Sequence, residues 1–243
     1  MLSCPNGHSY DANKRGYLTT LDSSKGILGD PRALLEARAA FLAAGHFDPI
    51  AEAVGSALPR DQLSILDAGT GTGFYLDWML RHGVDREALA LDASAAAVTM
   101  SVAAIGAPGL VADTWQPLAV RDARADVILC VFAPRNPAEF SRILRNDGTL
   151  LIVTPGPRHL RELRDAGLVI GMQEDKRERL EQSLGARFER SALVALSYPI
   201  ELDTESAHNL TTMGPSGHHA PAGAWAGGSV TVEVDVSSWR LRR

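Results

Sequence analysis

The stretch ILDAGTGTGFY constrains the fold more than any other part of the sequence. It combines an apolar strand that ends at Asp67, glycines at alternate positions (Gly69, Gly71 and Gly73), and the start of a helix. Glycine suits this loop because the backbone must turn sharply and let a ligand lie directly against it, which a Cβ would block. The stretch therefore predicts a nucleotide-binding loop in an α/β fold.

Secondary-structure patterns around this loop predict a mostly parallel sheet. From Leu63 onward, short apolar runs alternate with helical stretches, as in βαβ units with right-handed crossovers. FERSALVALSYPIEL and SVTVEVDVSSWRL alternate at period two and predict a closing antiparallel pair. The Gly-, Pro- and His-rich stretch TTMGPSGHHAPAGAWAGGS between them is expected to form a loop over the site. Upstream, Asp30 as N-cap, Pro31 as first residue and Gly45 as stop predict a helix.

Composition excludes several classes of protein. The chain has 243 residues and a net charge of −5, which argues against coating nucleic acid through bulk attraction. Its arginines nevertheless cluster in PRHLRELR and WRLRR, so a local basic patch stays open. No apolar run approaches the roughly 20 residues of a membrane span, and we expect a cytoplasmic protein. With Cys4 and Cys130 alone, a disulfide framework is excluded.

Acidic residues end three of the predicted strands and indicate which nucleotide binds. Asp67 stands at the mouth of the glycine loop, where a pyrophosphate would want an unopposed helix N-terminus. A carboxylate there suits a cationic amino-acid group, which favours S-adenosylmethionine over a dinucleotide. Asp92 is placed to accept hydrogen bonds from a ribose diol, and Asp113 to meet the adenine edge. The alternative is that these acids only cap helices.

The stretch VFAPRNP follows the fourth strand of this series. Methyltransferases that modify nucleobases commonly place a short Pro-containing stretch here, whose backbone carbonyls and flat side chain face the target base. Phe132, Ala133 and Pro134 are therefore candidates for the catalytic position, and Arg135 for a substrate contact. An ordinary strand-to-helix turn is the alternative.

These motifs, with CPNGHSYDANKRGYLTTL, ARAAFLAAGHFDPI, TPGPRHLREL and MGPSGHH, resemble the bacterial 23S ribosomal RNA guanine-N1-methyltransferases in order and over most of the chain. MGPSGHH resembles the tylosin-resistance branch. The resemblance implies a class I, Rossmann-like methyltransferase domain over residues 31–243, with a seven-stranded, mostly parallel sheet. It also implies an S-adenosylmethionine cofactor, a ribosomal RNA hairpin as substrate and macrolide resistance as a role. A homodimer is an open alternative for the assembly, because two copies would together supply four zinc ligands. A methyltransferase acting on a small molecule is the second reading, favoured by the acidic balance.

The resemblance also assigns site residues. The cofactor pocket would include Phe47, Asp67, Gly69, Gly71, Tyr75, Leu76, Asp92 and His159. Apart from the resemblance, the local arginines, the VFAPR stretch and the His-rich loop predict contacts to the RNA from Arg135, Arg158, Arg161, His218 and His219.

The CPNGH stretch resembles half of a zinc knuckle, and residues 1–30 are expected to be the remnant of an RNA-binding zinc module. The family normally binds zinc through a CxxC knuckle followed by CxxxH, and this sequence contains the second pair, Cys4 and His8. Structural zinc is almost always four-coordinate, and two ligands supply half of that shell. The sequence therefore predicts an incomplete site without stably bound zinc, unless two copies of the chain complete it.

Overall fold

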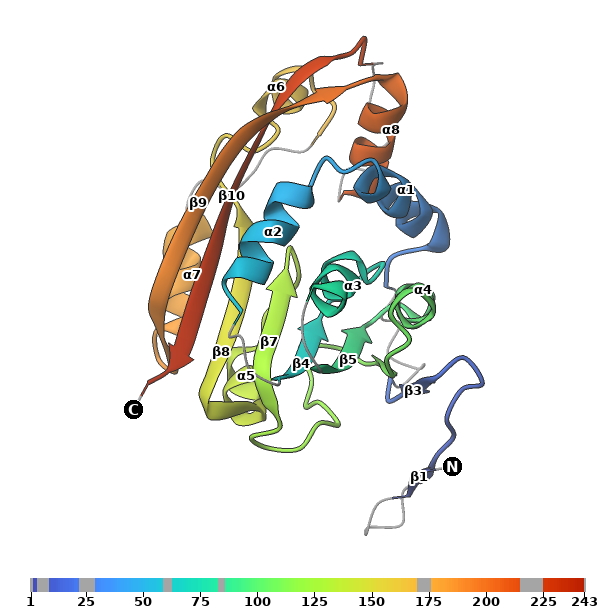
Figure 1. The fold of residues 1–243 in the computed structure, drawn as a ribbon, viewed down its shortest axis with the longest axis vertical. Helices are drawn as coiled ribbons and strands as arrows, with labels where there is room; N and C mark the ends of the chain where they lie inside the picture. The colour runs from blue at the N-terminus through green and yellow to red at the C-terminus, as the bar shows by residue number, and fades with distance from the viewer. Residues whose placement is uncertain are drawn as a thin grey trace.

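A computed structural model of the protein describes residues 2–3, 9–21, 29–58, 63–82, 86–169, 176–214 and 225–242. Its strands are β1 (Leu2–Ser3), β2 (Ser9–Tyr10), β3 (Tyr17–Thr19), β4 (Leu63–Ala68), β5 (Arg86–Asp92), β6 (Gly109–Val111), β7 (Ala125–Val131), β8 (Leu144–Pro155), β9 (Phe188–Leu202) and β10 (Gly228–Leu241). Eight of them form one sheet in the order β3-β6-β5-β4-β7-β8-β10-β9, and β1 pairs with β2 separately (Figure 1).

The sheet confirms the predicted mixture of strand directions. Every pair from β3 to β8 in this order is parallel, whereas β10 runs antiparallel to both β8 and β9. The expected number of seven strands was one short, because β3 adds to the edge of β6. Tyr17 is buried there against Val98 and Val111, and this burial makes a strand of a segment that the sequence argument assigned to the metal module. The domain boundary at residue 30 stays a prediction.

The helices cover both faces of the sheet. They are α1 (Arg32–Ala43), α2 (Asp48–Ser56), α3 (Phe74–Arg81), α4 (Ala95–Ile105), α5 (Pro137–Ile143), α6 (Arg161–Asp165), α7 (Lys176–Leu184) and α8 (Thr204–Met213). Side chains of β7 alternate between two cores: Val127 and Leu129 face α2 and α3, whereas Ile128 and Cys130 face α5 and α7. No helix in the described part of the chain combines the length and apolar character needed to cross a membrane.

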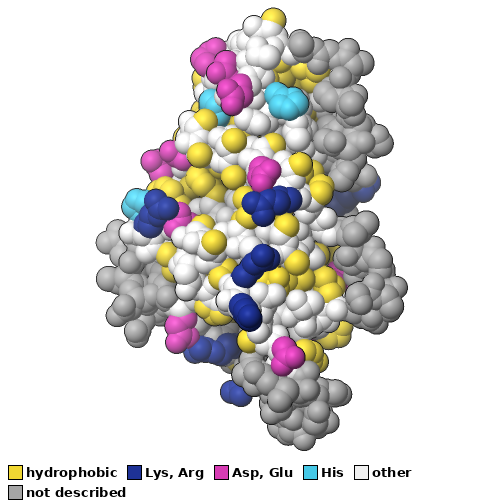
Figure 2. All heavy atoms as spheres, turned by 90° about the vertical axis from the view of Figure 1, so that its right-hand side faces the viewer, with side chains coloured by type: hydrophobic (Ala, Val, Ile, Leu, Met, Phe, Trp, Pro, Cys, Tyr) yellow, Lys and Arg dark blue, Asp and Glu magenta, His cyan; other side chains and the backbone are white. Residues whose placement is uncertain are grey.

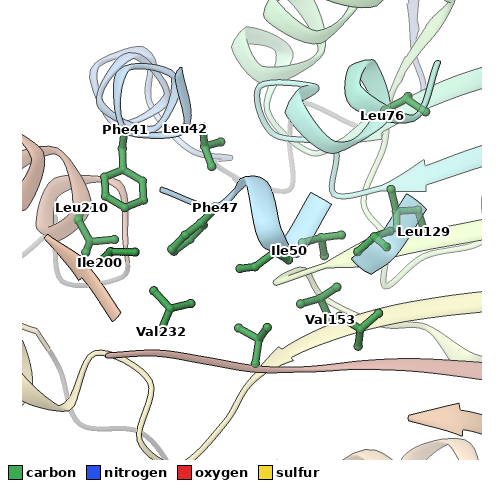
Figure 3. Packing of buried hydrophobic residues seen from close by; sticks show 14 of the residues in the cluster. Phe41, Leu42, Phe47, Ile50, Leu76, Leu129, Val153, Ile200, Leu210 and Val232 are labelled. Atoms are coloured by element: carbon green, nitrogen blue, oxygen red, sulfur yellow. The ribbon is translucent and has the colours of Figure 1, made fainter. Parts of the chain in front are cut away.

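In the larger hydrophobic core, the N-terminal helices α1 and α2 pack against the C-terminal strand β10. In Figure 3, Phe41 of α1, Ile50 of α2 and Val153 of β8 point into the same space as Val232 of β10. Phe47, between α1 and α2, packs edge-on against Phe41 with ring centroids 5.0 Å apart. This packing fixes the N-terminal helices over the sheet, beside the glycine loop.

Three local predictions need correction or addition. Pro31, not Asp30, is the N-cap of α1, because the Asp30 carboxylate accepts a hydrogen bond from Arg38 instead (2.7 Å). The predicted loop between β9 and β10 begins later than expected, since α8 extends to Met213. Helix α7 was not predicted, because it buries little more than Leu180 and Leu184 and therefore carries a weak apolar pattern.

Candidate active site

The glycine loop follows β4 and is held from both sides. Gly69, Gly71 and Gly73 all have positive φ, between 55° and 85°, a region that side chains with a Cβ rarely adopt. A Cβ on Gly69 would stand 2.3 Å from the Cβ of Ala133, and one on Gly73 would stand 2.7 Å from Ser101 Oγ. The loop is therefore packed against the segment after β7 and against α4, and its shape depends on glycine at these positions.

Asp92, the last residue of β5, fastens the loop to the neighbouring strand. Its Oδ2 accepts a hydrogen bond from the Gly71 N–H (3.0 Å), and its Oδ1 accepts one from the Ser94 N–H (2.9 Å). Burial raises its pKa, and these two hydrogen bonds oppose the shift. A carboxylate can accept about four hydrogen bonds, so capacity remains for the two hydroxyls of a ribose.

Asp67 lies buried at the base of the loop, with 3% of its surface exposed. Burial raises its pKa from 3.8 to about 7, and a hydrogen bond with Thr70 offsets part of that shift. The carboxyl group is thus protonated below neutral pH in the ligand-free protein. An ammonium group beside it would favour the charged carboxylate.

We therefore expect cofactor affinity to fall as the pH drops below about 7, by up to about tenfold per pH unit, because an ammonium-bearing ligand must first displace the Asp67 proton. Calorimetry in buffers of different ionisation enthalpy measures both the affinity and the proton released. Asp67→Asn should bind more weakly and lose this pH dependence. An unchanged pH profile in that variant would assign the titration to another group.

Tyr75 and Leu76 lie in the first turn of α3, which follows the loop. Leu76 is fully buried. The Tyr75 hydroxyl is buried without a hydrogen-bond partner among the described residues, which is costly for a polar group. The Asp92 carboxylate, which fastens the glycine loop, and this orphan hydroxyl together fit a bound S-adenosylmethionine.

Asp113 follows β6 and shapes a tight turn. Its Oδ1 accepts the Trp115 N–H (2.9 Å), and the Thr114 carbonyl accepts a hydrogen bond from the Asn136 side chain (2.9 Å). The turn presents Trp115 with 63% of its surface exposed. Contact of Asp113 with adenine stays a prediction. The exposed Trp115, which was not predicted from the sequence, is a candidate for contact with the substrate.

An aromatic cluster of Phe47, Phe132 and His159 lies beside the glycine loop. Phe132 stacks on His159 with centroids 6.1 Å apart, and Phe47 lies 6.3 Å from Phe132 and 6.2 Å from His159. Phe132 has a φ of +51°, uncommon for a bulky residue and characteristic of functional sites. Phe132 is 41% exposed, whereas Phe47 and His159 are buried. Phe132 is thus the accessible face of the cluster.

Of the two residues that follow Phe132, Ala133 packs inward and Pro134 is exposed. Ala133 contacts Gly69, as described above, and the carbonyl oxygens of Ala133 and Pro134 each lie 3.5 Å from Cys130 Sγ. Arg135 forms no ion pair with the residues that the structure describes. The catalytic assignment of Phe132, Ala133 and Pro134 stays a prediction.

The other arginines predicted to contact RNA differ in how strongly their side chains are held by acidic partners. Arg158 is held by Glu233, with its Nη2 2.9 Å from Oε1. Arg161 pairs with Glu162 (2.8 Å) and keeps 54% of its side chain exposed; an exposed pair of this kind is weak. Arg164 donates to the His159 carbonyl (2.6 Å) and so shapes the turn that carries the histidine. Cys4, His8, His218 and His219 lie outside the described residues.

Arg38 is the second residue that the sequence analysis missed. The available signal was an arginine at helical spacing with Leu34, Leu35, Phe41 and Leu42. On α1 this position faces the interior, and Arg38 Nη1 lies 3.2 Å from where a Cβ on Gly71 would stand.

A mostly parallel sheet with one antiparallel strand, β10, together with a glycine loop and acidic strand ends, defines a class I methyltransferase, for which S-adenosylmethionine is the implied cofactor. A family described as "Methyltransferase domain" matches residues 66–152. A solved structure of a geranyl diphosphate methyltransferase with geranyl diphosphate and sinefungin has a TM-score of 0.53 at 14% identity, over 79% of this chain and 77% of that one.

Two curated relatives identify the family more closely. The 23S rRNA (guanine(748)-N(1))-methyltransferase of Streptomyces fradiae is 38% identical over 90% of this chain and 80% of its own. A relative from Micromonospora griseorubida, provisionally named a 23S rRNA (guanine-N(1)-)-methyltransferase, is 37% identical with the same coverage. The chain belongs to the family of bacterial 23S rRNA guanine-N1-methyltransferases.

Proposed function

We propose that this protein methylates N1 of a guanine in 23S ribosomal RNA. The observation that carries the proposal is the aromatic cluster, whose exposed member, Phe132, lies next to the glycine loop through the contact between Ala133 and Gly69. A flat, accessible ring at this place suits a base that has left its stack. When bound, S-adenosylmethionine supplies an electrophilic methyl group.

The residues of this chain contribute alignment to the proposed reaction. Asp92 and the glycine loop would hold the nucleoside and amino-acid parts of the cofactor, while Phe132 would stack on the guanine. Because Phe132 and the loop are in fixed contact through Ala133, both partners are oriented by one rigid unit. Such orientation can lower the activation free energy by several kcal/mol.

RNA would be held by local cations rather than by overall charge. On the face in Figure 2, several Lys and Arg side chains lie one above another and others lie apart from them, with acidic side chains beside some of them. We propose Arg135 and Arg161 as the more available contacts, because Arg158 must first leave Glu233. The His218 and His219 contacts and the RNA hairpin as substrate belong to the same proposal.

Methyl incorporation into 23S rRNA from cells lacking the modification tests this function. N1 methylation blocks Watson–Crick pairing, so reverse transcription should stop at one guanine. Methyl incorporation without a reverse-transcription stop at a guanine would mean that another atom of the RNA accepts the methyl group. No RNA methylation, together with no RNA affinity at low salt, would favour the alternative of a small-molecule substrate.

We further propose that the enzyme acts in the cytoplasm, where ribosomes are, and that its modification confers macrolide resistance. Growth of a macrolide-sensitive host with and without the gene, in the presence of drug, tests the second point. A homodimer is also part of the proposal, and light scattering measures it.

For the metal, we propose that residues 1–30 are a zinc-module remnant that holds no stable zinc in this chain. Cys4 and His8 supply two of four ligands, so the purified protein is expected to contain well under one zinc per chain. Chelator should leave its melting temperature unchanged. Elemental analysis that finds half an equivalent would indicate a site shared across a dimer, and a full equivalent would contradict the proposal.

A further inference from the structure

Arg38 connects three parts of the chain beside the glycine loop. Its Nη2 donates to the Asp30 carboxylate (2.7 Å) and to the carbonyl of Met213 at the end of α8 (2.9 Å). Its Nη1 faces Gly71. A guanidinium group carries five N–H donors in a fixed fork, so donors on Nη1 and Nε remain after both hydrogen bonds are made.

The groups around Arg38 match an amino-acid zwitterion. Asp67 lies buried at the base of the same loop and suits the ammonium group. Arg38 supplies the complementary cation, and its side chain is 25% exposed, which leaves it partly shielded from water. Tyr75 adds a second donor, because its buried hydroxyl has no partner among the described residues.

We propose that Arg38 binds the carboxylate of the methionine part of S-adenosylmethionine, with the Tyr75 hydroxyl as a second donor. This inference rests on the proposed function only in its choice of cofactor. The competing explanation is that Arg38 merely clamps α1 to α8 through Asp30 and Met213.

The two explanations are separated by removing the carboxylate from the ligand. Calorimetry without RNA compares S-adenosylmethionine with decarboxylated S-adenosylmethionine, which keeps the amine, the sulfonium and the nucleoside. Arg38→Gln is expected to weaken binding of S-adenosylmethionine on the order of ten- to hundredfold, as when a charge-assisted hydrogen bond is lost. Binding of the decarboxylated ligand should change by less than about twofold.

Arg32→Gln is the matched control, because Arg32 lies on the same helix and pairs with Glu36 at the surface. It should leave both affinities unchanged. Equal losses for both ligands in Arg38→Gln would support the clamp and overturn the proposal, as would no loss for either. If that variant does not fold, Arg38→Lys replaces it: the lysine variant should still prefer the ligand with the carboxylate, and equal affinities would overturn the proposal.

Tyr75→Phe provides an independent measurement. It should weaken S-adenosylmethionine several-fold while leaving the melting temperature of the ligand-free protein unchanged or higher, because it removes an unsatisfied buried hydroxyl. A lower melting temperature would show that the hydroxyl serves the fold. These measurements contain no RNA, so their failure is distinct from a failure of the proposed guanine methylation.

Discussion

Replacing Asp92 with alanine is expected to weaken S-adenosylmethionine binding by about two orders of magnitude. The carboxylate fixes the Gly71 and Ser94 N–H groups and is the candidate acceptor for the ribose hydroxyls. The substitution would therefore remove ligand contacts and loosen the loop that shapes the pocket. Each charge-assisted hydrogen bond contributes roughly 1.5–3 kcal/mol, so the loss of two is readily measured by calorimetry.

Two further variants test whether the loss of cofactor affinity comes from the Asp92 carboxylate itself. Asp92→Asn keeps one oxygen acceptor and should fall between the wild type and Asp92→Ala. Asp77→Ala removes another acid, on α3, whose partner is the exposed Arg81, and this variant should bind the cofactor normally. A loss smaller than about threefold in Asp92→Ala would show that Asp92 only caps the turn before α4.

Replacing Phe132 with alanine is expected to lower methyl transfer to RNA about ten- to a hundredfold while cofactor affinity stays within about twofold. The reason is that the exposed Phe132 is the proposed stacking surface for the base, whereas the polar groups expected to hold the cofactor, Asp67 and Asp92, lie at the ends of β4 and β5. Single-turnover rates with saturating cofactor measure the first effect, and calorimetry measures the second.

Phe132→Tyr keeps a flat ring and should retain most of the activity. Trp115→Ala tests whether the other exposed aromatic residue shares the role, with weaker RNA binding as its expected signature. An unaltered methylation rate in Phe132→Ala would place the base pocket elsewhere. A matched loss of cofactor affinity would instead make Phe132 part of the cofactor site.

The glycine loop could be predicted because its requirements are local. Glycines at 69, 71 and 73 are readable as backbone positions that exclude a Cβ, and the structure gives each a positive φ. The parallel core was predictable for a similar reason, since each strand carries its own apolar run. The acidic strand ends could be placed at one edge of the sheet from the topology alone.

The features that could not be predicted from the sequence depend on contacts between residues that lie far apart in the chain. Arg38 meets Met213 across 175 positions, and its hydrogen bond with Asp30 overrides the capping role that local pattern predicted. The pairing of Arg158 with Glu233 on β10 joins residues 75 positions apart, and the predicted contact of Arg158 with RNA stays a prediction. The eighth strand was missed because three residues become a strand only when Tyr17 finds a buried place beside β6.

The insertion of β10 between β8 and β9 also sets the order in which the protein can be completed during synthesis. Residues 228–241 pair with Leu150–Pro155 on one side and with β9 on the other, so the central partner of three strands is translated last. Until that segment leaves the ribosomal exit tunnel, β8 and β9 each expose an unpaired edge, the condition under which nascent chains associate wrongly. Chaperone binding to stalled nascent chains should therefore persist until residue 241 has emerged and fall once β10 closes the gap.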